Sequence, residues 1–132
     1  MPIKVEWYDP EKTIRHWHFI GQWGWDEFFK LLDESTLELE QHSDRVIAVI
    51  MDMSETKSKG ENSFSMFKAG EKRTANNVDY IVFVGDMFIR FMVNTYVKLN
   101  RDMRYIVHVT DTIENAIDMI NQYRQTQQTH ST

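Results

Sequence analysis

Two histidines separated by one residue, His16 and His18, form the pair in this sequence best spaced to bind a metal ion. Alternate side chains of a β-strand point to the same face of a sheet, so both imidazoles could bind one ion. A zinc site usually needs four ligands, three or four of them from the protein, and we identify no third ligand close by in the sequence. We therefore expect no metal site here and predict that both histidines face solvent on an edge strand.

Three aspartates, Asp52, Asp86 and Asp111, each come at or just after the end of an apolar run. Open α/β sheets bind ligands at the carboxyl ends of their strands, so each aspartate could contact a ligand. Aspartate is also a good helix cap and turn residue, and we favour that interpretation for all three. We expect His108, inside the last apolar run, to be a hydrogen-bonded core residue rather than a general base.

No Gly-rich phosphate loop, nucleophile elbow or paired metal motif is present in the sequence. Each of these motifs places backbone or side-chain groups for a specific reaction or cofactor. We therefore expect a non-enzymatic protein without a cofactor.

The elements that must position these residues are read from hydrophobic periodicity. Period-two alternation and turn residues at Asp9 and Pro10 predict a hairpin, and short β-branched runs without polar alternation predict strands covered on both faces. Apolar residues at a spacing of three and four predict the helices. The predicted strands cover residues 3–8, 13–20, 46–51, 80–84 and 105–109, and the predicted helices cover residues 25–39, 63–74, 86–99 and 113–123.

This element order, β-β-α-β-α-β-α-β-α, predicts an α/β domain. Strands that alternate with helices form right-handed crossovers and a parallel sheet. We expect five strands, mostly parallel, with an antiparallel first strand. Residues 1–125 are predicted to form a single domain, followed by a flexible polar tail over residues 126–132.

Composition excludes several classes of function. A formal net charge of −5 opposes nucleic acid, and the basic residues are interleaved with acidic ones. The chain contains no cysteine, which excludes disulfides and cysteine nucleophiles. Without a signal peptide or a long apolar window, the sequence predicts a soluble, cytoplasmic protein that does not insert into membranes.

Two short segments, residues 23–28 (WGWDEF) and 49–54 (VIMDMS), together with the element order, resemble the STAS-like superfamily. The best-known members are the anti-sigma-factor antagonists, and the closer resemblance is to uncharacterised bacterial STAS-like proteins. It covers nearly the whole chain and implies the STAS fold. It also implies a phosphorylatable serine in the loop before the second helix, usually within an Asp-Ser-Ser-Gly motif, and a kinase-like anti-sigma factor as partner.

That motif is absent, because the loop reads ETKSKGENS over residues 55–63. By position Ser63 is the nearest equivalent of the family's serine, followed by Ser58 and Ser54. Phosphate at a helix N-terminus is stabilised there and adds charge that can block docking. The other interpretation is that Ser63 is an ordinary helix N-cap, and we favour it.

The predicted helix 86–99 carries more apolar residues than one buried side requires. A core stripe is predicted for Phe88, Ile89, Met92, Val93, Tyr96 and Leu99. Met87 and Phe91 fall outside it, on the side that also holds Lys98, and such residues are common at partner sites. We predict a homodimer through this side; the alternative is that a neighbouring helix covers it. Trp23, in the loop before the first helix, is a further interface candidate.

Three hypotheses for function follow. The first is a regulatory protein-interaction domain that meets a protein partner through the loop 52–63, with Asp52, Lys57, Lys59 and Gly60 as contact residues. The second is a binder of a small apolar or lipid-like ligand, because the chain is rich in Met, Phe and Trp and the related CRAL-TRIO domains hold lipids. The third and weakest is an enzyme built on Asp52 and His108.

Overall fold

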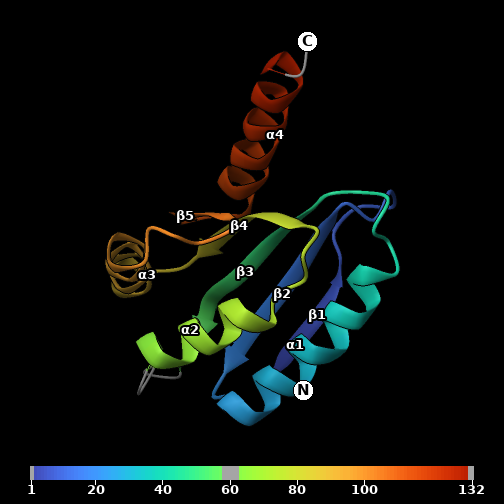
Figure 1. Cartoon of the computed structure of the whole chain (residues 1–132). Coiled ribbons are helices and arrows are strands. Elements are labelled where there is room, and N and C mark those ends of the chain that lie inside the picture. The colour runs from blue at the N-terminus through green and yellow to red at the C-terminus, as the bar shows by residue number, and fades with distance from the viewer. Residues whose placement is uncertain (1, 58–62, 131–132) are drawn as a thin grey trace.

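The computed structural model describes residues 2–57 and 63–130, which form a five-stranded sheet flanked by four helices (Figure 1). The strands lie in the order β1-β2-β3-β4-β5. β1 is antiparallel to β2, and the other neighbours are parallel, which confirms the predicted α/β layout. The bounds are β1 Ile3–Trp7, β2 Ile14–Gly21, β3 Ile47–Thr56, β4 Val78–Val84 and β5 Ile106–Thr110.

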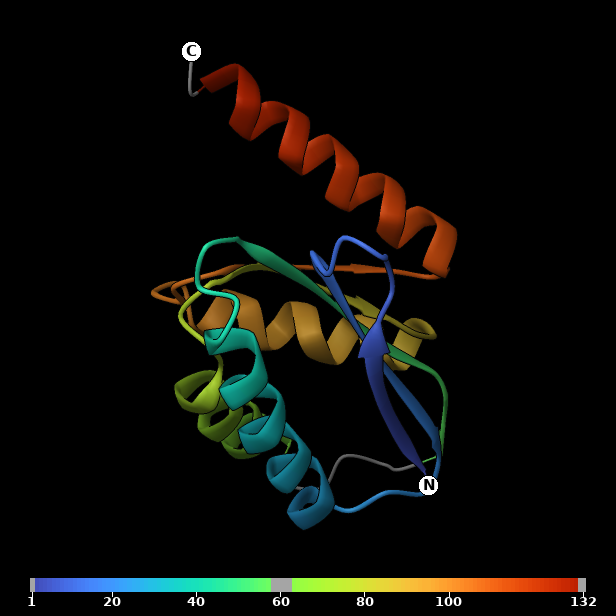
Figure 2. The ribbon, with the colours of Figure 1, turned by 90° about the vertical axis from the view of Figure 1, so that its right-hand side faces the viewer.

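The helices divide unequally between the two faces of the sheet. α1 (Trp25–Glu40), α2 (Ser63–Arg73) and α3 (Met87–Leu99) lie on one face, and α4 (Ile113–His130) lies on the other (Figure 2). From β2 to β5 the chain moves one strand at a time in a constant direction. Right-handed crossovers then place α1, α2 and α3 on the same face, so the opposite face is left to α4.

β3 is central and is covered on both faces. Val49 and Met51 belong to the core beneath α1, α2 and α3, whereas Ala48 and Ile50 belong to the smaller core beneath α4. This explains the apolar run without alternation. β3 is longer than the predicted strand 46–51 and pairs with β2 as far as Thr56. The pairing has one irregularity between His18 and Ile20, where β3 carries an extra residue.

The hairpin between β1 and β2 forms as predicted. The carboxylate of Asp9 accepts hydrogen bonds from the backbone N–H groups of Thr13 (3.0 Å) and Ile14 (2.9 Å). An aspartate that binds its own downstream backbone fixes a tight turn.

α4 crosses its face diagonally, and its C-terminal half rises away from the sheet (Figures 1 and 2). Arg124 anchors it, because its guanidinium donates to the carbonyl oxygen of Thr13 (2.7 Å) and to the Thr13 hydroxyl (3.1 Å). The helix continues to His130, although the sequence predicted a flexible tail from residue 126. The segment has no proline or glycine, and the Thr126 hydroxyl donates to the Gln122 carbonyl within the helix (3.0 Å).

None of the helices in the described ranges has the length and hydropathy needed to cross a membrane.

Candidate functional site

Asp52 lies inside β3, where the sequence predicted the start of a partner-binding loop. Only 6% of its surface is exposed. Its carboxylate accepts hydrogen bonds from the backbone N–H (3.1 Å) and the hydroxyl (2.7 Å) of Ser54. Burial opposes ionisation, but Ser54 and the neighbouring His16 and His18 outweigh it and lower the pKa of Asp52 from 3.8 to about 2. Asp52 accepts a hydrogen bond from the backbone two residues on, as a turn aspartate does, but it lies inside a strand and begins no helix. A buried negative charge therefore lies within the sheet.

The two histidines flank this charge on the part of the sheet that α4 leaves open. The Nε2 atom of His18 is 3.7 Å from Asp52 Oδ2 and 3.1 Å from Glu55 Oε2. His16 Nε2 is 4.0 Å from Asp52 Oδ2, and the two imidazole rings stack with centroids 5.9 Å apart. We name these four residues the histidine–aspartate cluster.

The predicted position of the histidines on an edge strand is wrong, because β2 lies between β1 and β3. The imidazoles of His16 and His18 are 15% and 29% exposed, respectively. The fold brings the carboxylates of Asp52 and Glu55 close to the histidines, and nothing in the sequence predicted this contact. In the ranges 2–57 and 63–130, no three His, Cys, Asp or Glu side chains are arranged to hold a metal ion. The arrangement instead suits ion pairing when the histidines are protonated.

Among the other residues of the predicted switch loop, the structure describes Ser54, Lys57 and Ser63. The hydroxyl of Ser54 is held by Asp52, and Lys57 directly follows β3. Ser63 is the first residue of α2. Ser58, Lys59 and Gly60 lie outside the described residues. The phosphorylation of any of these serines therefore stays a prediction.

His108 and the later aspartates differ in part from the predictions. His108 is exposed on β5, and its Nδ1 is 3.2 Å from the Tyr80 hydroxyl, so it is hydrogen-bonded but not a core residue. Asp86 caps α3, because its carboxylate accepts from Ile89 N (3.0 Å). Asp111 does not cap α4, since the Thr112 hydroxyl accepts from Asn115 N (3.1 Å) in that role.

Packing explains Trp23, which the sequence left as an interface candidate. Its ring is partly buried, with centroids 5.0 Å from Phe19 and 4.8 Å from Trp25. Its indole N–H donates to the Thr56 hydroxyl (2.6 Å) at the end of β3. The proposed interface role of Trp23 therefore loses its basis.

The outer side of α3 is the largest departure from the predicted core. Ile89, Val93 and Tyr96 are buried as predicted. Four large apolar side chains are exposed: Met87 by 79%, Phe88 by 56%, Phe91 by 72% and Leu99 by 69%. Met87 and Phe91 lie outside the buried stripe, as predicted. Phe88 and Leu99 were predicted to be buried, and that prediction is wrong. α3 lies beside the β5 edge of the sheet (Figure 1). Only a narrow side of the helix therefore packs against the core. We name the four exposed residues the α3 apolar surface.

An apolar cavity of about 60 Å³ lies between the sheet and α1, α2 and α3. Aromatic and methionine side chains from the sheet and the helices make most of its wall, including Phe28, Met51, Met53, Phe67 and Met103. Of α2, which forms one side, Gly70 is the one fully buried residue within 64–73. The helix therefore packs against the core mainly through partly buried side chains.

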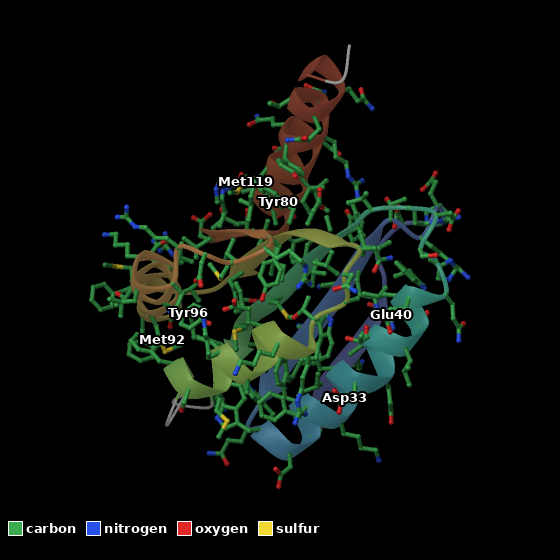
Figure 3. The ribbon with its side chains drawn as sticks, viewed as in Figure 1. Asp33, Glu40, Tyr80, Met92, Tyr96 and Met119 are labelled. Carbon is green, nitrogen blue, oxygen red and sulfur yellow. The ribbon has the colours of Figure 1, made fainter. Side chains whose placement is uncertain are left out.

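One charged group lines this cavity together with its hydrogen-bond partner. The hydroxyl of Tyr96 donates to Glu71 Oε1 (2.7 Å), and the Glu71 side chain is 16% exposed. Figure 3 shows Tyr96 on the side of α3 that faces α2. Burial, followed by the hydrogen bond to Glu71, raises the pKa of Tyr96, so the phenol keeps its proton. Sequence reasoning missed Glu71, although it follows Phe67 by four residues and so lies on the buried side of the helix.

The chain matches no protein-family model, no curated protein and no solved structure. The resemblance to the STAS-like superfamily therefore stays a prediction from the sequence.

Proposed function

We propose that the protein is an interaction domain that pairs with a second copy of itself through the α3 apolar surface. The observation that supports this proposal is the exposure of Met87, Phe88, Phe91 and Leu99 on a single helix. Apolar residues scattered singly over a surface need no explanation, but a contiguous set marks a contact site. Helical spacing joins three of them, because Phe91 follows Phe88 by three residues and Met87 by four, and such residues are neighbours on a helix. Leu99 lies about two turns further along the same side of α3.

A second copy supplies a matching surface by symmetry, since a two-fold interface brings the same patch together from both subunits. Burying a large apolar side chain contributes about 1.5–3 kcal/mol. Eight such side chains, each 56–79% exposed in the single chain, therefore contribute about 8–17 kcal/mol, against about 4–15 kcal/mol for the cost of association. The balance favours a dimer of moderate affinity.

The charges at the two ends of α3 favour an antiparallel contact. The acidic Asp86 precedes the helix, and the basic Lys98 lies in its last turn. An antiparallel pair brings the N-terminal end of each helix to the C-terminal end of the other, so opposite charges and opposite helix-dipole ends meet. A parallel pair would bring the like charges together.

The test is the molar mass in solution, measured by light scattering after size exclusion over a range of protein concentrations. The unmodified chain should give the mass of a dimer. Phe91→Glu places a charge in the middle of the surface and should raise the dissociation constant by about thirtyfold or more, which corresponds to about 2 kcal/mol. It should then run as a monomer.

Asn121→Glu is the matched control, because it adds the same charge to an exposed position on α4, on the other face of the sheet. It should leave the mass unchanged. A monomer for the unmodified chain at about 100 μM, well above a micromolar dissociation constant, would refute the proposal. Equal masses for the unmodified chain and Phe91→Glu would also refute it.

A further inference from the structure

The cavity beneath α2 has the composition of a ligand site rather than of an unfilled core. Close-packed interiors leave few voids larger than a water molecule, and those that are apolar stay dry. Here the wall combines aromatic rings with the flexible thioethers of Met51, Met53 and Met103. Methionine adapts its shape to different neighbours and is common at sites that accept varied apolar ligands. The wall can therefore change shape around a guest.

The wall also contains a polar pair placed where it can fix the orientation of a ligand. Ligand sites are mostly apolar with a few polar groups that set orientation and specificity. The Glu71 carboxylate accepts a hydrogen bond from the Tyr96 hydroxyl. The oxygen of Tyr96 and the remaining lone pairs of Glu71 are hydrogen-bond acceptors, so this end of the cavity favours a ligand that donates a hydrogen bond.

The charge on Glu71 decides which ligands enter. A carboxylate that is 84% buried repels a second carboxylate strongly, since the effective dielectric constant there is far below that of water. Lys68 offsets part of this charge from 3.8 Å, but its side chain is 42% exposed and its ammonium also donates to Asn100 Oδ1 (3.3 Å). Fatty acids and other anions are therefore disfavoured.

We infer that this cavity binds small, uncharged, mainly apolar molecules that carry a hydroxyl group, with the hydroxyl placed against Glu71 and Tyr96. The cavity is small, because an engineered apolar cavity that binds benzene measures about 150 Å³ and this one measures about 60 Å³. The ligand therefore has few non-hydrogen atoms, or it displaces the methionines. The inference does not depend on dimerisation, because Phe91 and Tyr96 lie on different sides of α3.

The experiment compares 1-butanol with butanoate by two-dimensional amide NMR of the full-length chain. Butanol should shift the indole signals of Trp23 and Trp25, which line the cavity, and the amide signal of Gly70. It should leave the indole signal of Trp7 unchanged, since Trp7 lies on the edge strand β1, outside the cavity wall, and its N–H donates to Glu38 of α1 (3.0 Å). Butanoate should bind more weakly by about tenfold or more.

Glu71→Gln tests whether the charge of Glu71, rather than its shape, selects the ligand. Glutamine has nearly the same shape, and its amide oxygen can still accept a hydrogen bond from the Tyr96 hydroxyl. The variant should bind butanoate more tightly than the unmodified chain does and so have a smaller preference for butanol. Glu34→Gln, at an exposed position on α1, should keep the full preference for butanol. Gly70→Leu fills the cavity next to Phe28 and Leu32 and should abolish the shifts. If that variant does not fold, the Glu71→Gln comparison still decides.

Two results would overturn the inference. If butanol at up to about 20 mM, which is above a millimolar dissociation constant, fails to shift the signals of Trp23, Trp25 and Gly70, the cavity does not bind it. Equal binding of butanol and butanoate by the unmodified chain would show that Glu71 does not select the ligand.

Discussion

Replacing Asp52 with asparagine removes the negative charge that lies between His16 and His18. A fall in the pKa of this carboxyl from 3.8 to about 2 on folding corresponds to about 2 kcal/mol of stability. Asparagine can still accept the hydrogen bonds from Ser54. The expected loss in the free energy of unfolding at about pH 7 is therefore about 1–2 kcal/mol.

The pH dependence gives the sharper test. Because the folded-state pKa of Asp52 lies below its unfolded-state value, its contribution is complete above about pH 5 and is lost as the pH falls towards 2. Asp9 and Glu38 also have lowered pKa values, since hydrogen bonds to each carboxylate outweigh its burial. The stability that these two carboxylates contribute is therefore also lost as the pH falls through the acidic range. The difference between the unmodified chain and Asp52→Asn isolates Asp52.

The assay is urea unfolding followed by tryptophan fluorescence at a series of pH values. The two chains should differ in stability above about pH 5 and converge as the pH approaches 2. Asp44→Asn is the control, because the Asp44 side chain is 71% exposed and its contact is the ion pair with its neighbour Arg45. It should change stability little. Parallel pH profiles for the unmodified chain and Asp52→Asn would refute the role assigned to this charge.

Two further substitutions test the packing of α2 and α4. Gly70→Ala should raise the free energy of unfolding by about 0.5–1 kcal/mol, because the added methyl meets Phe28 Cε2 at 3.7 Å and Leu32 Cδ2 at 3.8 Å, which are ordinary contacts. A lower midpoint in thermal unfolding would contradict this. Arg124→Ala removes both hydrogen bonds to Thr13 and should cost about 1–2 kcal/mol. Amide hydrogen exchange should become faster in the C-terminal half of α4, and unchanged protection there would show that Arg124 does not anchor the helix.

The same physical feature explains both proposed sites on α3. A helix at the side of a three-layer arrangement touches the sheet along one narrow side, so its remaining apolar residues need other partners. On one side of α3, Tyr96 meets α2 and the cavity. On the outer side, Phe91 remains exposed.

The sequence by itself determined the identity and order of the elements. Local patterns carry that information, because alternation along 3–8 and the unbroken apolar run at 46–51 report how many faces of a strand are covered. Asp9 and Asp86 were predictable for the same reason, since a turn and a helix cap involve residues three to five apart.

Tertiary structure decided what depends on neighbours far apart in the chain. The pairing of β2 with β3 brings His18 to Asp52 and Glu55, contacts that span more than thirty residues and leave no local signal. The position of α3 beside the sheet exposes Phe88 and Leu99, although their spacing matches a core stripe. Helical periodicity predicts that one side of a helix is apolar, but the width of the side that is buried depends on which elements lie against it.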